Sequence, residues 1–431
     1  MEFNKLVMIT DGIILNYTNE TCNSIVTDTR EICNNDAFIP IIGKKENGAI
    51  YLEEAIKEGA SIIFVTDSDI KKFLNINPNI GIIKVDSGLE ALKKIAKYYR
   101  NMYQGKIIAI TGSNGKTTTK EMTASVLSGK YNVFKSIKSY NNVIGICKML
   151  LKLKEEEVAV FELGMNHAGE IKDMVDILRP DIGLITNIGT AHIGNLGSKE
   201  EILKAKLEIT DNNLEMLFIN GDDDYLKNVI YDNKIEYSIK NLDYLENDSS
   251  INIYIDDTEI KVDTYGKHNL YNICASIAIA KYLNLTTSEI KKGFDDYQSI
   301  RMKKMIIKNT LIIDDSYNAN PESMMVGIDY VNNLQYKNKI LVLGDMLELG
   351  IDSSYYHKQV GEYIRKTSIN KVYTYGNESK YIGNSCQKIS NHYIEKDYLV
   401  LDLKEDLGDD TVIYFKGSRA MGLEEIIDKI R

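Results

Sequence analysis

One short stretch of this chain has the residue types that bind a nucleotide phosphate: TGSNGKTT, residues 111–118. The standard phosphate loop, G-x-x-x-x-G-K-[ST], would need glycine at position 110, where this chain has Ile110. The spacing is the shorter G-x-x-G-K-T, between a strand pattern and a helical pattern. Glycines in such a turn let backbone N–H groups point at one anion, and the helix N-terminus adds its positive end. We therefore predict a phosphate cradle formed by Gly112, Ser113, Asn114, Gly115, Lys116, Thr117 and Thr118.

Lys116 and Thr117 have distinct expected roles in this cradle. The lysine reaches the β- and γ-phosphates, and the threonine hydroxyl ligates Mg²⁺. The alternative is a glycine-rich turn before a surface helix, which gives the Lys-Thr pair no packing purpose. We therefore expect the stretch to bind a nucleotide.

Two further polar residues follow neighbouring buried strands. Glu162 comes after an apolar strand pattern, and His192 lies in the loop after the next one. Because chemistry in such sheets gathers at the carboxyl ends of the strands, both side chains are expected beside the cradle, as a shell for Mg²⁺. His192 taken alone has an alternative as a hydrogen-bonded core histidine. Lys206, on the next predicted helix, has the spacing of an ordinary surface lysine.

The elements that must position these residues alternate between strand and helix. From about residue 106, short apolar runs are separated by helical stretches such as GEIKDMVDILR, the pattern of βαβ units on a parallel sheet. A second such series runs from TLIIDDSYN to TVIYFKGS. A polar, less regular stretch at about 221–265 separates the two series.

These patterns predict an α/β protein with three domains. Residues 1–105 form a small N-terminal α/β domain in this prediction. Residues 106–300 form a central P-loop-like ATPase domain with a mainly parallel sheet, and residues 301–431 form a C-terminal Rossmann-like α/β domain.

Composition limits the classes of function. The 431 residues are 44% hydrophobic and carry a formal net charge of -10, so nucleic acid is not an expected partner, because phosphate backbones are met by basic surfaces. Five scattered cysteines without C-x-x-C spacing indicate reduced thiols rather than disulfides or a zinc site. No apolar run approaches the ~18 residues that span a bilayer, and the N-terminus lacks the basic region of a signal peptide. We expect no membrane contact and a cytoplasmic location.

Several segments, in order along the chain, resemble the Mur ligase family of ATP-dependent amino-acid ligases: TGSNGKTT, ELGMNHAGEI, TNIGTAHIGNLGSKEEILKAKLEI and GKHNLYNICASIAIA. IIDDSYNANPESM, LGDMLELG and FKGSRAMGLE are similar to the branch that adds D-alanyl-D-alanine to UDP-N-acetylmuramoyl-tripeptide. The N-terminal TDTR and NGAIYLEEAIKEGA match, more loosely, the part that holds the UDP-sugar. The resemblance covers nearly the whole chain. It implies a monomeric enzyme of cytoplasmic peptidoglycan precursor synthesis that uses ATP and Mg²⁺.

The resemblance also implies a role for each matching residue. Glu162 and His192 would be Mg²⁺ ligands with Thr117, and Lys206 matches a position that the family carries as a carbamylated lysine bridging to a second Mg²⁺. The residues implied in catalysis are Lys116, Lys206, His192 and Arg301. Beyond the cradle, the implied ATP contacts are Asn269, Asn272, Arg301, Asp314 and Asp315. Asp28 and Arg30 are implied for the UDP-sugar, and the implied acceptor contacts are Asn318, Asn320, Lys416, Ser418 and Arg419.

By the same resemblance, the three domains would bind the UDP-sugar substrate, ATP and the acceptor, in chain order. The sequence departs from the family pattern at a few positions. Asn47, Gly48 and Ala49 stand where the family often has DGH, which weakens the UDP-sugar assignment. Leu207 replaces a common glycine, and Lys303 and Lys304 stand where an acidic residue often follows the hinge. None of these changes removes the chemical group of a motif.

The implied reaction transfers the γ-phosphoryl group of ATP to the tripeptide carboxylate, giving an acyl phosphate that the amine of D-alanyl-D-alanine attacks. We expect the C-terminal domain to close over the cleft, because water would hydrolyse this intermediate. Three alternatives stay open: another amino-acid ligase of the same family, a P-loop ATPase or switch without ligase activity, and a nucleotide-binding scaffold. The third residue of the tripeptide, lysine or diaminopimelate, is also open.

Overall fold

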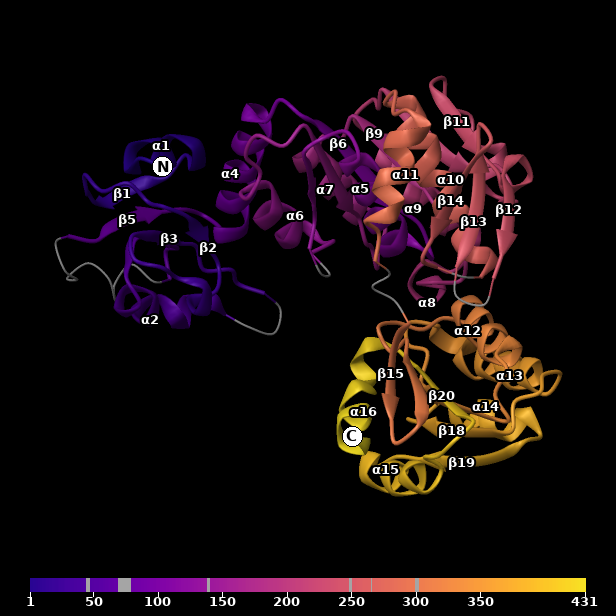
Figure 1. The fold of residues 1–431 in the computed structure, drawn as a ribbon. Coiled ribbons are helices and arrows are strands. Elements are labelled where there is room, and N and C mark those ends of the chain that lie inside the picture. The colour runs from indigo at the N-terminus through magenta and orange to yellow at the C-terminus, as the bar shows by residue number, and fades with distance from the viewer. Residues whose placement is uncertain (44–46, 69–78, 138–139, 248–249, 265, 299–301) are drawn as a thin grey trace.

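Sheets with their own helices form three regions along the chain (Figure 1). The computed structural model describes residues 1–431 except 44–46, 69–78, 138–139, 248–249, 265 and 299–301. The central region carries the N-terminal one on one side and the C-terminal one below it in the view of Figure 1. In the described part of the chain, no helix has the length and apolar character needed to cross a membrane. The predicted α/β class is confirmed, whereas the domain boundaries near residues 105 and 300 stay predictions.

The N-terminal region has a five-stranded sheet with the order β1-β5-β4-β3-β2, in which only β1 pairs antiparallel. Its long helix α4 packs its apolar face into the same core as helices α6 and α7 of the central region. This shared core joins the two regions through buried side chains. The elements are α1 (Phe3–Thr10), β1 (Ile13–Asn16), β2 (Ile25–Val26), β3 (Asp36–Phe38), α2 (Leu52–Lys57), β4 (Ala60–Val65), β5 (Gly81–Lys84) and α4 (Gly88–Met102).

The central sheet has six parallel strands in the order β11-β10-β9-β6-β8-β7. Successive residues of β6 point to opposite faces, so Ile107 packs with helices α6 and α7 while Ile108 packs with α5 and α10. Helices on both faces explain why the strands are apolar throughout. The elements are β6 (Lys106–Thr111), α5 (Lys116–Ser128), β7 (Val133–Lys135), α6 (Val143–Leu150), β8 (Val158–Glu162), α7 (Glu170–Leu178), β9 (Ile182–Ile185), α8 (Ile193–Leu196), α9 (Lys199–Leu207), β10 (Met216–Asn220) and β11 (Lys234–Tyr237).

The stretch at 221–265, which the sequence marked as polar and less regular, contains strands that the sequence analysis did not identify. After β11, the strands β12 (Asp243–Glu246), β13 (Ile251–Ile255) and β14 (Thr258–Val262) form an antiparallel sheet. Ile251, Ile253 and Ile255 are buried and alternate with more exposed polar or aromatic residues, so no continuous apolar run marks the strand. The helices α10 (Lys267–Tyr282) and α11 (Thr287–Asp295) follow.

The C-terminal region has a six-stranded sheet with the order β15-β16-β20-β17-β18-β19, parallel except for the pair β15 and β16. Helices α12, α13 and α14 share a core with one face, and α15 and α16 with the other. The elements are β15 (Lys303–Ile307), β16 (Thr310–Asp314), α12 (Pro321–Asn333), β17 (Asn338–Gly344), α13 (Ser353–Ile364), β18 (Lys371–Tyr375), α14 (Lys380–Cys386), β19 (Ile389–Tyr393), α15 (Lys396–Glu405), β20 (Thr411–Lys416) and α16 (Glu424–Ile430).

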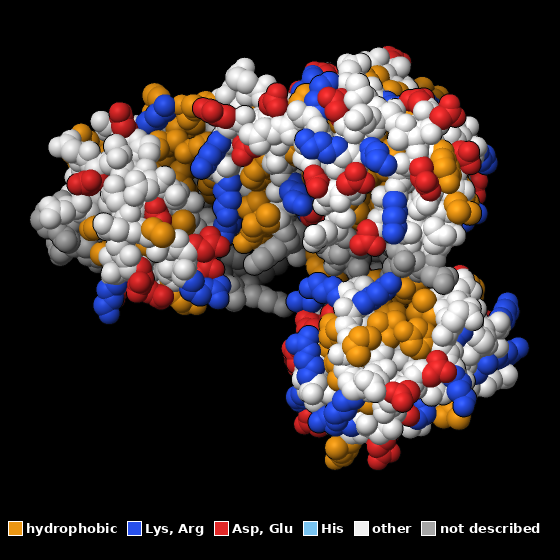
Figure 2. Space-filling view, in the orientation of Figure 1, with side chains coloured by type: hydrophobic (Ala, Val, Ile, Leu, Met, Phe, Trp, Pro, Cys, Tyr) orange, Lys and Arg blue, Asp and Glu red, His pale blue; other side chains and the backbone are white. Residues whose placement is uncertain are grey.

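Surface charge is mixed on the face shown in Figure 2. Among the residues coloured there, acidic and basic side chains are interspersed over all three regions and form no broad basic surface. This distribution accords with the formal net charge of -10.

Candidate functional site

The glycine loop between β6 and α5 has glycines at positions where a side chain would not fit. Gly112 has φ 149° and Gly115 has φ 80°, both in the region that favours glycine. A Cβ atom on Gly112 would lie 1.8 Å from Thr186 Oγ1, and one on Gly115 would lie 2.7 Å from Asn272 Oδ1. The two glycines are therefore fixed by close packing as well as by φ.

Side chains from the loop after β9 hold the centre of the glycine loop. Asn114 N donates to Asn187 Oδ1 at 2.9 Å, and Asn187 Nδ2 donates to Asn114 O at 3.0 Å. Thr186 Oγ1 donates to the same carbonyl at 2.6 Å. The loop is thus held in shape by the protein itself, as a preorganised anion site requires.

Lys116, the first residue of α5, folds its ammonium over this loop. Its Nζ donates to Gly112 O at 2.7 Å and to Ser113 O at 3.3 Å. The charge therefore lies at the loop, beside the N-terminal end of a helix of 13 residues. A cation and the positive end of the helix dipole together favour a bound phosphate.

Thr117 and Glu162 meet at the carboxyl edge of the central sheet. Thr117 Oγ1 donates to Glu162 Oε2 at 2.8 Å, and Asn141 Nδ2 donates to Glu162 Oε1 at 3.0 Å. The hydroxyl and the buried carboxylate are hard oxygen donors of the kind Mg²⁺ prefers. No group of three or more His, Cys, Asp or Glu side chains among the described residues could hold a metal. This donor set fits Mg²⁺, which commonly takes one or two protein carboxylates and completes its shell with phosphate oxygens and water.

Asn141 was not among the residues predicted for the site. Its neighbour Asn142 caps α6 by accepting a hydrogen bond from Gly145 N, so an Asn-Asn pair before a helix has a sufficient structural explanation. The contact with Glu162, 21 positions away, and a place in the cavity wall mark Asn141 as part of the site.

His192 caps α8 in a left-handed conformation, with φ 67°. Its Nδ1 lies 2.6 Å from Glu348 Oε2 of the C-terminal region, without the alignment of a good hydrogen bond. Burial lowers the pKa of His192, Glu348 opposes this, and the cations Lys116 and Lys206 add to the lowering. The imidazole is therefore kept neutral, the form that can ligate a metal.

Lys206 lies in the interior, and its expected place on the surface was wrong. Its side chain is 1% exposed, and no hydrogen bond or ion pair joins its amine to another described residue. Burial, and then the nearby Lys116, hold the pKa of Lys206 well below that of an ordinary lysine. A buried amine with a lowered pKa reaches its neutral, reactive form more readily than a surface lysine does.

Two asparagines of α10 lie on the other side of the glycine loop. Asn272 Nδ2 donates to Asn269 Oδ1 at 2.8 Å, while Asn272 Oδ1 accepts from Thr119 Oγ1 at 2.9 Å. His268, beside them, faces Asp315 and the C-terminal region. Burial lowers the pKa of His268 to about 4.

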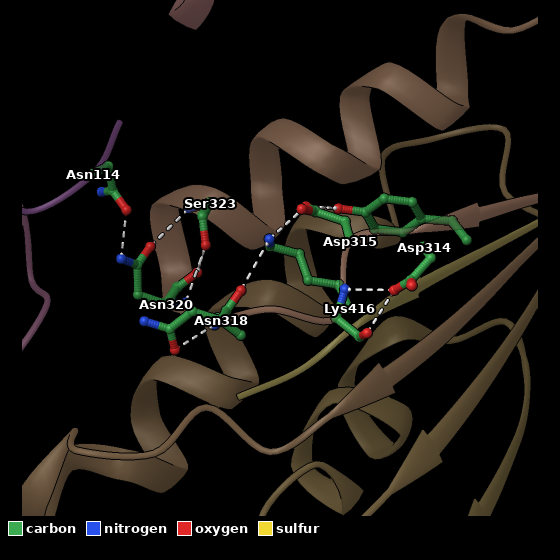
Figure 3. Close-up of polar contacts among 10 residues, drawn as sticks. Asn114, Asp314, Asp315, Asn318, Asn320, Ser323 and Lys416 are labelled. Carbon is green, nitrogen blue, oxygen red and sulfur yellow. Dashed lines mark hydrogen bonds and ion pairs between the residues drawn. The ribbon is translucent and has the colours of Figure 1, made fainter. Parts of the chain in front are cut away.

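The C-terminal region contributes residues that follow β16 and end β20 (Figure 3). Lys416 Nζ donates to Asp315 Oδ2 at 2.6 Å and to Asn318 O at 3.1 Å. Asp315 Oδ2 also accepts from the hydroxyl of Tyr414 at 2.8 Å. Asp314, one residue earlier, accepts instead from Ser316 N at 3.0 Å.

Direct hydrogen bonds connect the C-terminal region with the central one. Asn320 Nδ2 donates to Asn114 Oδ1 in the glycine loop at 2.6 Å (Figure 3). Glu322 accepts from Thr190 through both carboxylate oxygens, from Oγ1 at 2.7 Å and from the backbone N at 3.1 Å. Sequence patterns gave no signal for Thr190 or Glu322, because each is an ordinary polar residue in its own segment.

One cavity of about 1140 Å³ runs between the two regions. It exceeds the ~300–1,000 Å³ of usual small-molecule sites, so it has room for more than a nucleotide. The residues predicted for the site that line it are Ser113, Asn114, Gly115, Lys116, Thr117, Thr118, Glu162, His192, Asn269, Asn272, Asp315, Asn318, Asn320, Lys416, Ser418 and Arg419. The described wall does not include Gly112, Lys206 or Asp314. Arg301 lies outside the described residues.

Asp28 and Arg30 lie apart from this cavity, in the N-terminal region. Arg30 Nη2 is 2.6 Å from Asp28 Oδ2, and this hydrogen bond lowers the pKa of Asp28 to about 2. The neighbouring Glu31 pairs with Lys148 of α6 at 2.9 Å. The exposed Arg30 guanidinium therefore lies near the central region without reaching the glycine loop.

The arrangement can hold the phosphates of a nucleotide at one end of a cavity whose other end is closed by a separate region. A cation and an oxygen pair suited to Mg²⁺ lie where a terminal phosphate would rest. Such a site can neutralise charge that develops on a transferred phosphoryl group.

Comparisons with known proteins agree with this geometry. The Mur ligase middle domain matches residues 110–280, and the Mur ligase, glutamate ligase domain matches residues 300–419. UDP-N-acetylmuramoyl-tripeptide–D-alanyl-D-alanine ligase of Bacillus subtilis is 35% identical over 95% of this chain and 93% of its own length. MurF from Acinetobacter baumannii has the same fold, with a TM-score of 0.89 at 26% identity over 100% of this chain and 98% of that one. MurF ligase from Thermotoga maritima in complex with ADP gives a TM-score of 0.82 at 27% identity, covering 94% and 96% of the two chains.

Proposed function

The chain belongs to the Mur ligase family, and we propose that it joins D-alanyl-D-alanine to UDP-N-acetylmuramoyl-tripeptide with ATP as the energy source. It is an ATP-dependent ligase that forms a peptide bond in peptidoglycan synthesis. The match to the Bacillus subtilis ligase named for these substrates covers nearly the whole of both chains. The resemblance found in the sequence is thereby confirmed.

The observation that carries this function is the cavity between the glycine loop and the C-terminal region. Residues of the glycine loop in the central region and five residues of the DDSYNANP segment (Asp315, Tyr317, Asn318, Ala319 and Asn320) line the same space. A P-loop ATPase or switch needs the first set of groups alone. A ligase must bring a nucleotide and an acceptor amine to one place, which accounts for both sets.

The reaction needs activation, because a carboxylate and an amine do not form an amide in neutral water. The γ-phosphoryl group of ATP passes to the terminal carboxylate of the tripeptide, giving an acyl phosphate and ADP. The amine of D-alanyl-D-alanine attacks the acyl carbon, and inorganic phosphate leaves as the amide forms. Lys116 neutralises the charge that develops on the transferred group. The C-terminal region keeps water from the acyl phosphate.

Mg²⁺ is the implied cofactor, and the oxygen atoms at the sheet edge suit it. Thr117 and Glu162 would hold the ion, and His192 would add a neutral imidazole. The bound ion would supply positive charge beside the terminal phosphate. Asn141 orients the Glu162 carboxylate through the oxygen that Thr117 does not contact.

Lys206 is assigned the role of a carbamylated lysine. Carbamylation joins CO₂ to a neutral amine and releases a proton, and the buried Lys206 amine has a lowered pKa that favours the neutral form. The product would be a carboxylate-like group, whose negative charge would lie near the Lys116 cation and could hold a second Mg²⁺.

The remaining assignments follow the family pattern. Asn269 and Asn272 take the adenine side, and Asp314, Asp315 and Arg301 contact the nucleotide from the C-terminal region. Asp28 and Arg30 bind the UDP-sugar. Asn318, Asn320, Lys416, Ser418 and Arg419 position the acceptor. In this proposal residues 1–105, 106–300 and 301–431 are the UDP-sugar, ATP and acceptor domains of a cytoplasmic monomer.

One assay tests the function. The protein is incubated with ATP, Mg²⁺ and UDP-N-acetylmuramoyl-tripeptide, with either lysine or diaminopimelate at the third position, with and without D-alanyl-D-alanine. We expect a new product of the summed mass less water, with one phosphate released per product. Lys116→Ala serves as the inactive control.

Two results would overturn the proposal. Phosphate release that is independent of D-alanyl-D-alanine indicates an ATPase or switch. Addition of a single amino acid to a shorter UDP-linked precursor, with no use of the dipeptide, indicates a different ligase of the family. Oxygen-18 in the substrate carboxylate should appear in the released phosphate, and its absence there would exclude the acyl phosphate.

A further inference from the structure

The segment LGDMLELG, residues 343–350, follows β17 and has no role in the reaction as described so far. It brings the C-terminal region against α8. Glu348 Oε2 lies 2.6 Å from His192 Nδ1, and Glu348 O accepts from Gly194 N at 3.2 Å. The segment therefore reaches the candidate metal ligand His192 through Glu348.

Glu348 holds this position in an unfavourable backbone conformation. Its φ of 65° is left-handed, which a non-glycine residue adopts only where its surroundings fix it from several sides. Two of the preceding backbone N–H groups are held by side chains. Leu347 N donates to Ser418 Oγ at 2.9 Å, and Met346 N donates to His357 Nε2 at 3.0 Å.

His357 is fully buried on α13 and uses both ring nitrogens. Because Met346 supplies an N–H, Nε2 must be the unprotonated acceptor. The proton of the neutral ring is then on Nδ1, which donates to Ser353 O at 2.8 Å. Burial lowers the pKa of His357, so the ring is neutral at pH 7. The ring cannot turn over without breaking both bonds.

We propose that His357 is a positioning residue for the ligation reaction, which holds the backbone at Met346 so that Glu348 stays against His192. His357 is not among the described residues that line the cavity. Its effect reaches the site through the short path from Met346 to Glu348. The proposal deepens the function proposed above and rests on it.

Two substitutions distinguish the hydrogen bond at Nε2 of His357 from the one at Nδ1. In His357→Gln, the amide oxygen falls near the place of Nε2 and can still accept from Met346 N. In His357→Asn, the shorter amide can still donate to Ser353 O but cannot reach Met346. Both variants bury one uncharged amide, so they form a matched pair for stability. If His357→Asn does not fold, His357→Leu is the variant without either bond.

The readouts are the amide hydrogen exchange of Met346 and the ligation kcat and KM values, each normalised to folded protein. We expect His357→Asn to exchange the Met346 amide at least about tenfold faster and to lower kcat about tenfold, since one buried N–H loses its partner. His357→Gln should stay within about threefold of the unmodified protein in both. In a Glu348→Gln background, the His357→Asn change should lower kcat no further, because both changes act on one contact.

A purely structural role predicts a different pattern. Equal kcat values for the Asn and Gln variants would overturn the proposal. It would also be overturned if His357→Asn lowered kcat in the Glu348→Gln background by the same factor as in the unmodified protein. Hydrogen exchange at the Met346 amide measures its hydrogen bond to His357 and does not depend on catalytic activity. If the unmodified protein does not ligate at all, the proposed function fails, while this exchange measurement still reports whether His357 holds the loop.

Discussion

Asn320, the residue that caps α12, donates a hydrogen bond from Nδ2 to Oδ1 of Asn114, 206 positions earlier in the chain. The loop that would hold the phosphates is therefore in direct contact with the C-terminal region. Asn320 also accepts from Ser323 N at 2.9 Å through its other amide atom. One side chain thus starts a helix and connects two regions.

Replacing Asn320 with serine should separate these two roles. Serine is a good N-cap but too short to reach Asn114, so we expect an unchanged melting temperature and a kcat lowered about five- to tenfold, from the loss of ~1 kcal/mol. Asn320→Ala is the control that also loses the cap, at about 1 kcal/mol of stability. Ligation assays and thermal melts measure both. Full kcat in Asn320→Ser would show that the contact with Asn114 has no part in turnover.

The hydroxyl of Thr117 should set the requirement for Mg²⁺. Thr117→Ser keeps the hydroxyl and Thr117→Val removes it at nearly constant shape. We expect the valine variant to need at least about tenfold more Mg²⁺ for half-maximal ligation, while serine stays near the unmodified protein. Magnesium titrations of the ligation rate measure this. The same midpoint for both variants would remove Thr117 from the metal site.

Lys206→Ala should lose ligation and recover part of it when short carboxylic acids are added. The added carboxylate would take the place of the carbamate proposed on Lys206. Lys204→Ala is the matched control, because Lys204 lies on the same helix but is exposed and paired with Glu201. The ligation rate of Lys204→Ala should equal that of the unmodified protein. If acetate and formate leave Lys206→Ala wholly inactive, carbamylation of Lys206 loses its support.

His268 should make folding sensitive to acid. Its pKa is about 4 in the folded chain against an ordinary value of 6.5, mainly because of burial. Between these values the unfolded chain binds more protons, so stability falls as pH drops from 6.5 towards 4. We expect His268→Gln to lose less melting temperature between pH 7 and pH 5 than the unmodified protein. The exposed His167 gives the control His167→Gln, which should behave like the unmodified protein. An equal loss in all three proteins would contradict the prediction.

Local patterns in the chain identified the two series of alternating strands and helices, because strands covered by helices on both faces are continuous apolar runs. They did not identify the outer strands β7, β11, β15 and β19. The same criterion missed β13, where Ile251, Ile253 and Ile255 alternate with more exposed residues on a half-buried sheet. The alternation has a period of two and would have been the usable signal.

For the candidate site, the pattern of residues 111–118 sufficed to find the glycine loop, since its glycines, lysine and threonine are consecutive and their roles depend on local geometry. Glu162 could be placed because it ends a strand next to β6. Lys206 could not be placed, because its helix contains lysines of both kinds: Lys204 is exposed and Lys206 is 1% exposed. Which one is buried depends on how α9 packs.

The sequence by itself determined the α/β class, the glycine loop and the family, because each depends on residues close together along the chain. Only the tertiary structure decided that Lys206 is buried, that Asn320 contacts Asn114, and that His357 accepts a hydrogen bond from Met346 N. These relationships join segments from 11 to 206 positions apart, and some cross two regions of the molecule. Burial and contact between such segments arise from packing, which no local pattern specifies.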